Sequence, residues 1–199
     1  MSTIAPSRLA EAVAASAAES VGLLLARATL IGLPEDASRA LVFGCGSGHT
    51  TVALADYLGT AFGIDPSAEL VSCAELAYPS HAHCAFAVGG VDQLEALPGR
   101  FDLIHADLSR RQLVSRADTP RAVSALVSAL TPSGLAAIGI SARGSRRGAG
   151  GSARWSAVSE GIAAAEGRVT WVSGREGDAI WIFVRGRAAQ TQLRLVPAV

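Results

Sequence analysis

Short apolar runs alternate with amphipathic segments along most of this chain. The runs read as buried strands, and between them apolar residues recur at the three- and four-residue spacing of helices. The predicted strands are 40–43, 61–65, 83–88, 101–107 and 135–140. The predicted helices begin after the first strand at 50–55 and continue with 67–77, 91–97, 120–130 and 153–165. Regular alternation of this kind predicts an α/β fold with a parallel sheet between helical layers.

Two more apolar runs close the pattern, at 168–172 and 179–184. About six residues part them, whereas a parallel pair needs a crossover of a dozen or more. They therefore predict an antiparallel hairpin. The expected architecture is a three-layer α/β/α sandwich whose seven-stranded sheet is mostly parallel. The segment Thr131-Pro132-Ser133-Gly134 reads as the turn that enters the fifth strand.

The N-terminal segment also has a helical period. It predicts one long or two short helices before the first strand, which cover the sheet or close over a ligand as a lid. The apolar positions are Leu9, Val13, Ala17, Val21, Leu24 and Ala28. The expected organisation is a helical segment at 1–35, the main domain at 36–186 and a tail or edge strand at 187–199.

A glycine turn, Gly44-Cys45-Gly46-Ser47-Gly48, follows directly behind the first strand. Glycine reaches positive φ and lets a backbone approach a ligand closely. The next helix, which Thr50 or Thr51 can cap, would present its first N–H groups to that ligand. About 20 residues later Asp65 ends the second strand, the spacing at which a carboxylate meets a ribose diol in nucleotide-binding βαβ units. Together these features predict a nucleotide-type site.

Composition favours small-molecule chemistry. In 199 residues, 17 basic and 17 acidic side chains balance, so no global field favours nucleic acid or membrane as a partner. The longest apolar stretch, 21–32, is interrupted by Arg27 and is shorter than the ~20 residues of a spanning helix. No secretion signal is apparent. Three cysteines without close pairing predict free thiols, and with these features a cytoplasmic protein.

Over residues 36–186 the chain resembles the class I S-adenosylmethionine-dependent methyltransferases, in its strand order, glycine turn and closing hairpin. The resemblance implies a Rossmann-like fold and S-adenosylmethionine as cofactor, with S-adenosylhomocysteine as product. It also implies cofactor contacts by residues at four strand ends. These are Gly44, Cys45, Gly46 and Gly48 at the methionine part, Asp65 and Pro66 at the ribose, Val91 and Asp92 at the adenine, and Asp107.

A nicotinamide dehydrogenase is the competing nucleotide-binding fold. Its GxGxxG turn would place a third glycine where this chain has His49. It also rarely ends in an antiparallel hairpin. Both features favour the methyltransferase resemblance.

Two positions depart from the family pattern. Val42 stands where the family has a carboxylate that helps hold the cofactor's amino group, and Gly90 stands where an acidic residue is frequent. A charge-assisted contact of this kind is worth about 1.5–3 kcal/mol. The alternative therefore stays open that the protein has lost methyl transfer and serves as a cofactor-binding scaffold, a non-methylating enzyme or a partner subunit.

The candidate catalytic residues are Asp107 and His105 at the end of the fourth strand, on one face if the strand alternates regularly. Asp107 could orient or deprotonate a substrate or cap local backbone, and His105 could equally pack under a helix. The family resemblance favours an oxygen acceptor, because Asp107-Leu108-Ser109-Arg110 lacks the motif of amino-directed members. No metal is expected, since Gly139-Ile140-Ser141 supplies no carboxylate and none clusters with His81 and His83.

Four arginines surround a glycine-rich loop after the fifth strand, at 143–151. They could attract an anionic substrate or simply be solvated. They are Arg143, Arg146, Arg147 and Arg154. The sequence leaves a homodimer open and does not identify the methyl acceptor.

Overall fold

A single seven-stranded sheet forms the centre of the protein. The computed structural model describes residues 6–97, 100–109, 113–141, 150–176 and 179–186. The strand order is β3-β2-β1-β4-β5-β7-β6, and β7 runs antiparallel to both of its neighbours. The strands are β1 Arg39–Phe43, β2 Thr60–Asp65, β3 Cys84–Val88, β4 Phe101–Asp107, β5 Leu130–Ser141, β6 Arg168–Glu176 and β7 Ala179–Arg185. The predicted fold class, including the closing hairpin, is confirmed.

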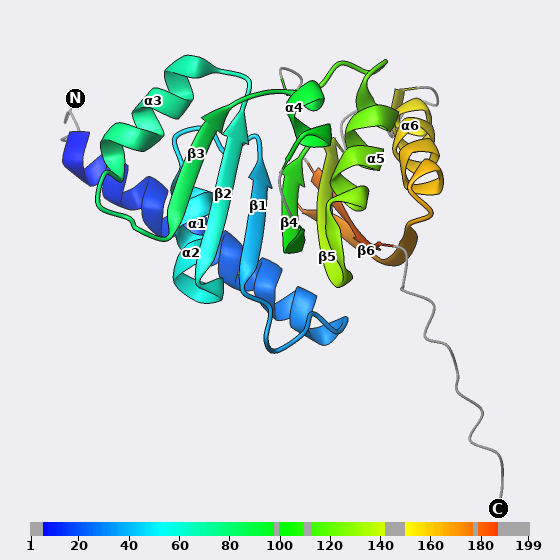
Figure 1. Ribbon diagram of the computed structural model, residues 1–199, viewed down its shortest axis with the longest axis horizontal. Helices are drawn as coiled ribbons and strands as arrows, with labels where there is room; N and C mark the ends of the chain where they lie inside the picture. Colours follow the sequence, from blue (N-terminus) through cyan, green and yellow to red (C-terminus); the bar gives the residue numbers. More distant parts are fainter. Residues whose placement is uncertain (1–5, 98–99, 110–112, 142–149, 177–178, 187–199) are drawn as a thin grey trace, which may run out of the picture.

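Helices cover both faces of this sheet (Figure 1). They are α1 Pro6–Leu30, α2 His49–Leu58, α3 Ala68–Ala77, α4 Val91–Glu95, α5 Thr119–Ser128 and α6 Gly150–Ala164. One core cluster packs α1 and α2 against the sheet, and the other packs α4, α5 and α6. The switch in strand order falls between β1 and β4, so the carboxyl ends of these two strands form the crevice where such sheets bind ligands.

The N-terminal segment is one helix, α1. In its second half Val21, Leu24 and Ala28 are buried in the core beside α2, while Val13 in its first half is 44% exposed. The stretch Glu11–Leu30 has a mean hydropathy of 1.3, long and apolar enough by composition to cross a membrane. Of this stretch 17% is buried. The second half of α1 packs on the sheet beside α2, and the first half lies beside the crevice.

Arg185 at the end of β7 fixes the C-terminal end of α1. Its guanidinium donates hydrogen bonds to the carbonyl oxygens of Ile31 (2.8 Å), Gly32 (2.6 Å) and Ser133 (2.9 Å). Ile31 and Gly32 follow directly after Leu30, the last residue of α1, so the guanidinium lies at the C-terminal end of the helix, where a cation complements the helix dipole. This contact ties α1 to the β5–β7 side of the sheet.

Three local predictions need correction. The segment Thr131–Gly134 belongs to β5, whose pairing with β4 shifts register between Phe101 and Leu103. The N-cap of α2 is Gly48, with no side-chain cap, because the helix begins at His49 and Thr50 and Thr51 already lie in its first turn. The predicted helix at 91–97 ends at Glu95. The tail predicted at 187–199 lies outside the described residues.

Candidate active site

The carboxyl ends of β1 and β4 place the candidate residues side by side. In the parallel register Val42 pairs with His105 and Phe43 with Ala106, so Asp107 stands one position past the last pair, as Gly44 does. Side chains alternate along a strand, and Val42, His105 and Asp107 therefore share one face. That face is the one that α1 covers, because Val42 lies in the same core cluster as Val21 of α1.

A cavity of about 500 Å³ opens at this point. It is lined by residues of α1, of the glycine turn, of the start of α2 and of the strands β1, β4 and β7. Its walls are Ala12, Val13, Ser16, Ala17, Ser20, Val42, Gly44, Cys45, Gly46, Ser47, His49, Thr50, His105, Asp107 and Trp181. Among these described residues Asp107 is the only carboxylate. Both predicted catalytic residues thus face one space with the glycine turn.

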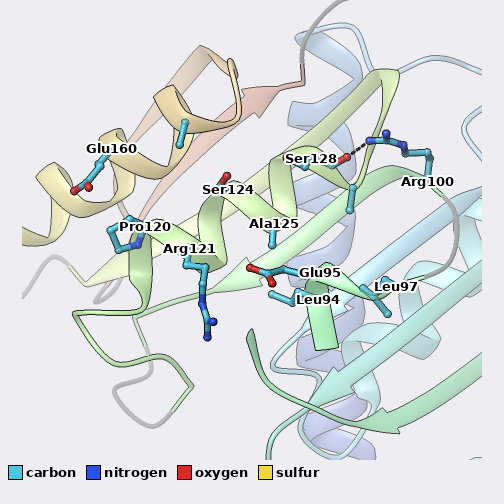
Figure 2. A pocket seen from close by; sticks show the side chains of 12 residues that line it. Leu94, Glu95, Leu97, Arg100, Pro120, Arg121, Ser124, Ala125, Ser128 and Glu160 are labelled. Carbon is cyan, nitrogen blue, oxygen red and sulfur yellow. Dashed lines mark hydrogen bonds between the residues drawn. The ribbon is translucent and has the colours of Figure 1, made fainter. Parts of the chain in front are cut away.

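A larger groove, about 650 Å³, lies on the opposite face of the sheet between α4, α5 and α6 (Figure 2). Apolar residues such as Leu94 and Ala125 line it together with four charged residues, which are Glu95, Arg100, Arg121 and Glu160. None of the predicted catalytic residues and no glycine of the turn line it. Size alone therefore does not identify the active site.

The glycine turn has the backbone that its sequence predicts. Gly44, Gly46 and Gly48 have φ angles of 81°, 55° and 90°, values that side chains larger than hydrogen rarely adopt. A Cβ at Gly48 would also stand 2.9 Å from the Phe86 ring. The turn is therefore specified both by conformation and by close packing.

The Asp65 carboxylate fastens this turn to the end of β2. One carboxylate oxygen accepts a hydrogen bond from the Gly46 amide and the other from the Ser67 amide, each at 2.9 Å. Asp65 is 6% exposed, and a buried carboxylate needs such donors. Its predicted contact with a ribose stays a prediction, as does that of Pro66, and Asp65 already has a structural function.

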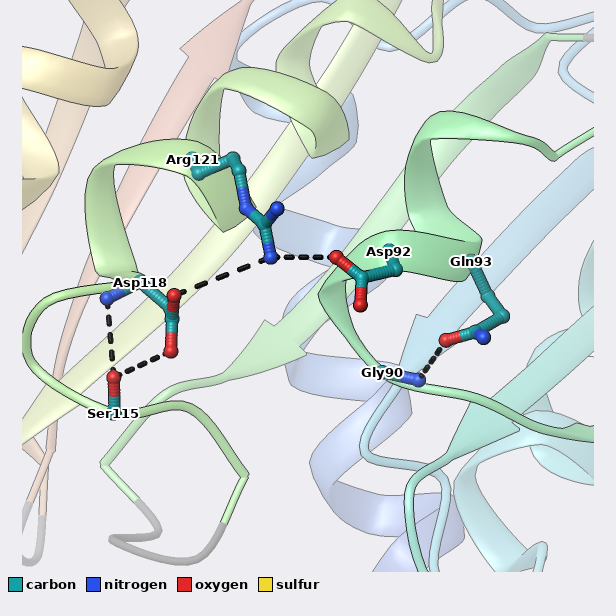
Figure 3. Close-up of polar contacts among 6 residues, drawn as sticks. All are labelled: Gly90, Asp92, Gln93, Ser115, Asp118 and Arg121. Carbon is teal, nitrogen blue, oxygen red and sulfur yellow. Dashed lines mark hydrogen bonds and ion pairs between the residues drawn. The ribbon is translucent and has the colours of Figure 1, made fainter.

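The turn between β3 and α4 lies where adenine was predicted to bind. The Gly90 amide donates to the side-chain oxygen of Gln93 at 2.8 Å, which closes the first turn of α4 (Figure 3). The Asp92 carboxylate pairs with Arg121 of α5 at 2.7 Å. The adenine contacts assigned to Val91 and Asp92 stay predictions. The Val91 side chain is half-buried, whereas that of Asp92 is exposed.

Aromatic and small side chains surround the two candidate catalytic residues. The His105 and Trp181 rings lie 5.0 Å apart at an interplanar angle of 35°. The Asp107 carboxylate accepts a hydrogen bond from the Ser109 amide at 3.0 Å, so the predicted local capping contact is present. A Cβ at Gly139 would lie 3.0 Å from both Asp107 and Trp181. The absence of a side chain at Gly139 therefore leaves room for the Trp181 ring against the sheet.

His49 and Cys45 complete the wall beside the turn. His49 Nδ1 lies 3.0 Å from the Ser47 hydroxyl, and its ring meets Tyr78 edge-on at 5.8 Å. His49 is thus half-buried rather than fully solvated. Burial, with a smaller effect of the Asp65 charge, raises the pKa of the Cys45 thiol to about 12. Cys45 is accordingly a neutral wall residue and not a nucleophile.

Of the four arginines considered as candidates after β5, Arg154 does not line the cavity. Arg154 donates to the Leu108 carbonyl at 2.9 Å and so ties α6 to the end of β4. Arg143, Arg146 and Arg147 lie outside the described residues. Among the residues that the structure describes, no three His, Cys, Asp or Glu side chains gather into a group that could hold a metal ion.

The residues present fit S-adenosylmethionine in most respects. Gly44, Cys45 and Gly46 offer the close-approach backbone that the methionine part needs, and they open into the cavity. Val42 is 1% exposed and apolar, so it cannot pair with an ammonium group. Asp107 supplies a carboxylate in the same cavity.

Comparison with known proteins bears on the family and the fold. Residues 40–134 match the family model described as a methyltransferase domain. No curated protein matches the sequence.

Among solved structures, the chain is similar to an S-adenosylmethionine-dependent methyltransferase from Clostridium acetobutylicum, with a TM-score of 0.67 and 14% identity over 83% of this chain and 89% of that one. It is also similar to magnesium protoporphyrin IX methyltransferase from Synechocystis, with a TM-score of 0.61 and 17% identity over 87% and 79%. An rRNA methylase from Streptococcus thermophilus gives a TM-score of 0.60 and 13% identity over 81% and 94%. Identities this low show the fold and select no acceptor.

Sequence reasoning missed two contributions to the cavity. The first is the inner face of α1, where Ser16 and Ser20 line the wall; the helical period indicated a cover but not which half would face the crevice. The second is Trp181, which read only as a strand residue. The glycine opposite it in the β5–β7 register, Gly139, is the one signal that could have indicated room for a ring.

Proposed function

Because this chain belongs to the class I S-adenosylmethionine-dependent methyltransferases, we propose that it methylates an oxygen atom of a small molecule without a metal ion. The observation that carries the proposal is the single cavity that the glycine turn, Asp107 and His105 line together. When bound, S-adenosylmethionine supplies an electrophilic methyl group on a sulfonium centre. The protein then contributes mainly by holding the acceptor oxygen in line with that methyl group.

Asp107 takes over the function of the missing carboxylate at position 42. Val42 and Asp107 lie on the same face of neighbouring strands, and Asp107 stands level with the first glycine of the turn. The cofactor's methionine part carries an ammonium group, and Asp107 is the only acidic side chain among the described residues of the cavity wall. A charge-assisted hydrogen bond to Asp107 therefore offsets the loss of the usual one.

His105 is the residue that receives the acceptor's proton. A hydroxyl group becomes a better nucleophile as its proton leaves, and an imidazole is suited to accept that proton near neutral pH. The Trp181 ring beside it fixes the position of the imidazole. With Asp107 engaged by the cofactor, one ring nitrogen of His105 serves as general base and then holds the proton.

The cavity size supports a small acceptor. Ser16 and Ser20 of α1 form one wall opposite the sheet, and the volume is about 500 Å³. Pockets of ~300–1,000 Å³ are typical of drug-sized ligands. Because the methionine part of the cofactor fills the end of this space beside the glycine turn, the remaining room suits a small acceptor. The balanced charge of the chain gives no support to a nucleic-acid acceptor.

Labelled methyl transfer tests this proposal. Purified protein, incubated with methyl-labelled S-adenosylmethionine and the small-molecule fraction of an extract, should form a labelled product. Mild hydrolysis then distinguishes two kinds of O-methylated product, because it releases the label from a methyl ester and not from a methyl ether. Replacement of His105 by Gln should lower the rate of transfer by roughly 10²–10⁴-fold and leave cofactor binding unchanged. Tight binding without any labelled product would instead favour the scaffold alternative, for which Val42 is the supporting observation.

A further inference from the structure

One face of β1, β2 and β3 has little helical cover in the part of the chain that the structure describes. Figure 1 shows α1 and α2 behind these strands, whereas α5 and α6 lie on the near side, over the other half of the sheet. On this near side α4 has only five residues. Phe62 of β2 is therefore half-buried, and its register partner Ala85 of β3 is exposed. Because parallel sheets normally have both faces covered, this face is an unpartnered surface.

A hollow of about 340 Å³ lies on this face, at the amino ends of the strands. We call it the open hollow. Its apolar walls include Phe62, Ala82, Ala85 and Leu97. Leu97 also lines the groove between α4, α5 and α6 (Figure 2), so it forms a ridge between the two spaces. An apolar ridge beside an apolar hollow is a shape that can interlock with a second copy of itself.

Arg39 gives the open hollow a positive charge. Its guanidinium stacks over the Phe101 ring at 5.4 Å, a contact that leaves its charge and its N–H donors unneutralised. The neighbouring Asp102 carboxylate is occupied by other donors, which are the amides of Ser38 and Arg39 and the Thr131 hydroxyl. Among the described residues the Arg39 side chain forms no ion pair.

Glu95 gives the other side of the Leu97 ridge a negative charge. It is exposed at the end of α4 and lines the groove. Both cations of the groove are engaged elsewhere: Arg121 pairs with Asp92 at 2.7 Å, and Arg100 donates to the Ser128 carbonyl in the last turn of α5. Within the described part of the chain Glu95 has no ion pair. The face therefore carries an unpaired cation in its hollow and an unpaired anion at its ridge.

We propose that this face docks on the same face of a second copy of the chain, about a two-fold axis. Leu97 of each copy enters the open hollow of the other copy. Glu95, two residues before Leu97, then approaches Arg39 in the wall of that hollow. A two-fold axis makes each contact twice, and the opposite charges of ridge and hollow favour a second copy as the occupant. The inference is independent of the proposed function, because none of these residues lines the active-site cavity.

Sedimentation velocity of the full chain tests the apolar contact. As the concentration rises from about 1 to about 100 µM, the wild-type protein should shift from monomer to dimer. Leu97→Asp should remain monomeric over this range, because its carboxylate would be buried without a partner in the hollow. Leu76, which is 81% exposed on α3, provides the matched control: Leu76→Asp should dimerise like the wild type. Circular dichroism confirms that each variant is folded.

Charge reversal tests the register of the two copies. Arg39→Glu and Glu95→Arg each place like charges opposite one another, so each should raise the dissociation constant of the dimer by about tenfold or more. The protein with both substitutions should recover the wild-type constant to within a few-fold, because the pair is restored with its sign exchanged. Glu75→Arg on the exposed side of α3 is the control and should leave the constant unchanged.

A wild-type protein that stays monomeric at about 100 µM would overturn the proposal. So would a dimer whose dissociation constant is the same in Leu97→Asp, since such a dimer uses another face. The segment 187–199, which lies outside the described residues, is the competing occupant, and a chain without it should dimerise as the full chain does. Dimerisation that appears only after its removal would assign this face to that segment and contradict the proposal.

Discussion

Val42 and His105 are paired residues on the neighbouring parallel strands β1 and β4. The strand that carries His105 ends two residues later in Asp107, and Val42, His105 and Asp107 all line the same cavity as the glycine turn. Under the proposed function, the carboxylate that binds the cationic cofactor lies on β4 instead of β1.

Replacement of Asp65 by Ala should destabilise the protein as well as weaken cofactor binding. The variant leaves the buried amide of Gly46 and the half-buried amide of Ser67 without their acceptor, which should lower the free energy of unfolding by about 1–3 kcal/mol. Urea denaturation measures the change. Asp36, which is exposed before β1, provides the control Asp36→Ala, which should change stability by less than about 0.5 kcal/mol. Equal stability of the two variants would refute the structural function of Asp65.

Two glycine substitutions should have opposite effects. Gly48 has a φ of 90°, and a Cβ there would stand 2.9–3.0 Å from Phe86 and Ala74; Gly48→Ala should cost about 1–3 kcal/mol. Gly22 lies within α1, and a Cβ there would meet no atom within 4 Å. Gly22→Ala should therefore stabilise the protein by about 0.5–1 kcal/mol. Thermal unfolding of the two variants measures both changes in stability. A Gly48→Ala protein more stable than wild type would contradict the claim that the turn requires glycine at this position.

The cysteines should differ strongly in reactivity. A pKa of about 12 for Cys45 leaves only on the order of one thiol in ten thousand ionised at pH 8. A raised pKa favours the neutral thiol, so reactivity should appear only at strongly alkaline pH. Cys73 is exposed and should be alkylated by iodoacetamide at pH 8 while Cys45 is protected, as peptide mass spectrometry can show. In denaturant all three cysteines should react, and comparable native rates for Cys45 and Cys73 would be the contrary result.

Arg185 should control the order of α1. Arg185→Ala removes the hydrogen bonds to Ile31, Gly32 and Ser133, which frees the C-terminal end of the helix that covers the site. Amide hydrogen exchange in the last turns of α1 should accelerate, while exchange in β1 should change little. Arg168→Ala, on the edge strand β6, is the control. Unchanged exchange in α1 would show that core packing alone holds the helix.

The alternation of strands and helices was predictable because apolar runs along the chain are separated by segments of helical period. The start of β5 was not, since Pro132 and Gly134 are typical of turns, yet a shift in pairing with β4 lets the strand continue through them. The site was predictable where backbone geometry dictates residue type, as at Gly44 and Gly48. Side-chain neighbours across the sheet, such as Trp181 beside His105, depend on register and stayed hidden.

The central claim is that Asp107 binds the cofactor in place of a carboxylate at position 42. Calorimetric titration with S-adenosylmethionine tests it on four proteins: wild type, Asp107→Asn, Asp56→Asn on the exposed side of α2, and Val42→Asp combined with Asp107→Asn. Asp107→Asn should bind about ten- to a hundredfold more weakly than wild type. Asp56→Asn should bind like wild type.

A carboxylate at position 42 in the Asp107→Asn background should restore binding to within a few-fold of wild type, provided that circular dichroism shows the double variant folded. The comparison of wild type with Asp107→Asn decides the claim even if the double variant does not fold. Weakened binding in Asp107→Asn alone is the predicted result. Wild-type affinity in Asp107→Asn, or no heat from the wild-type protein at high cofactor concentration, would contradict the account.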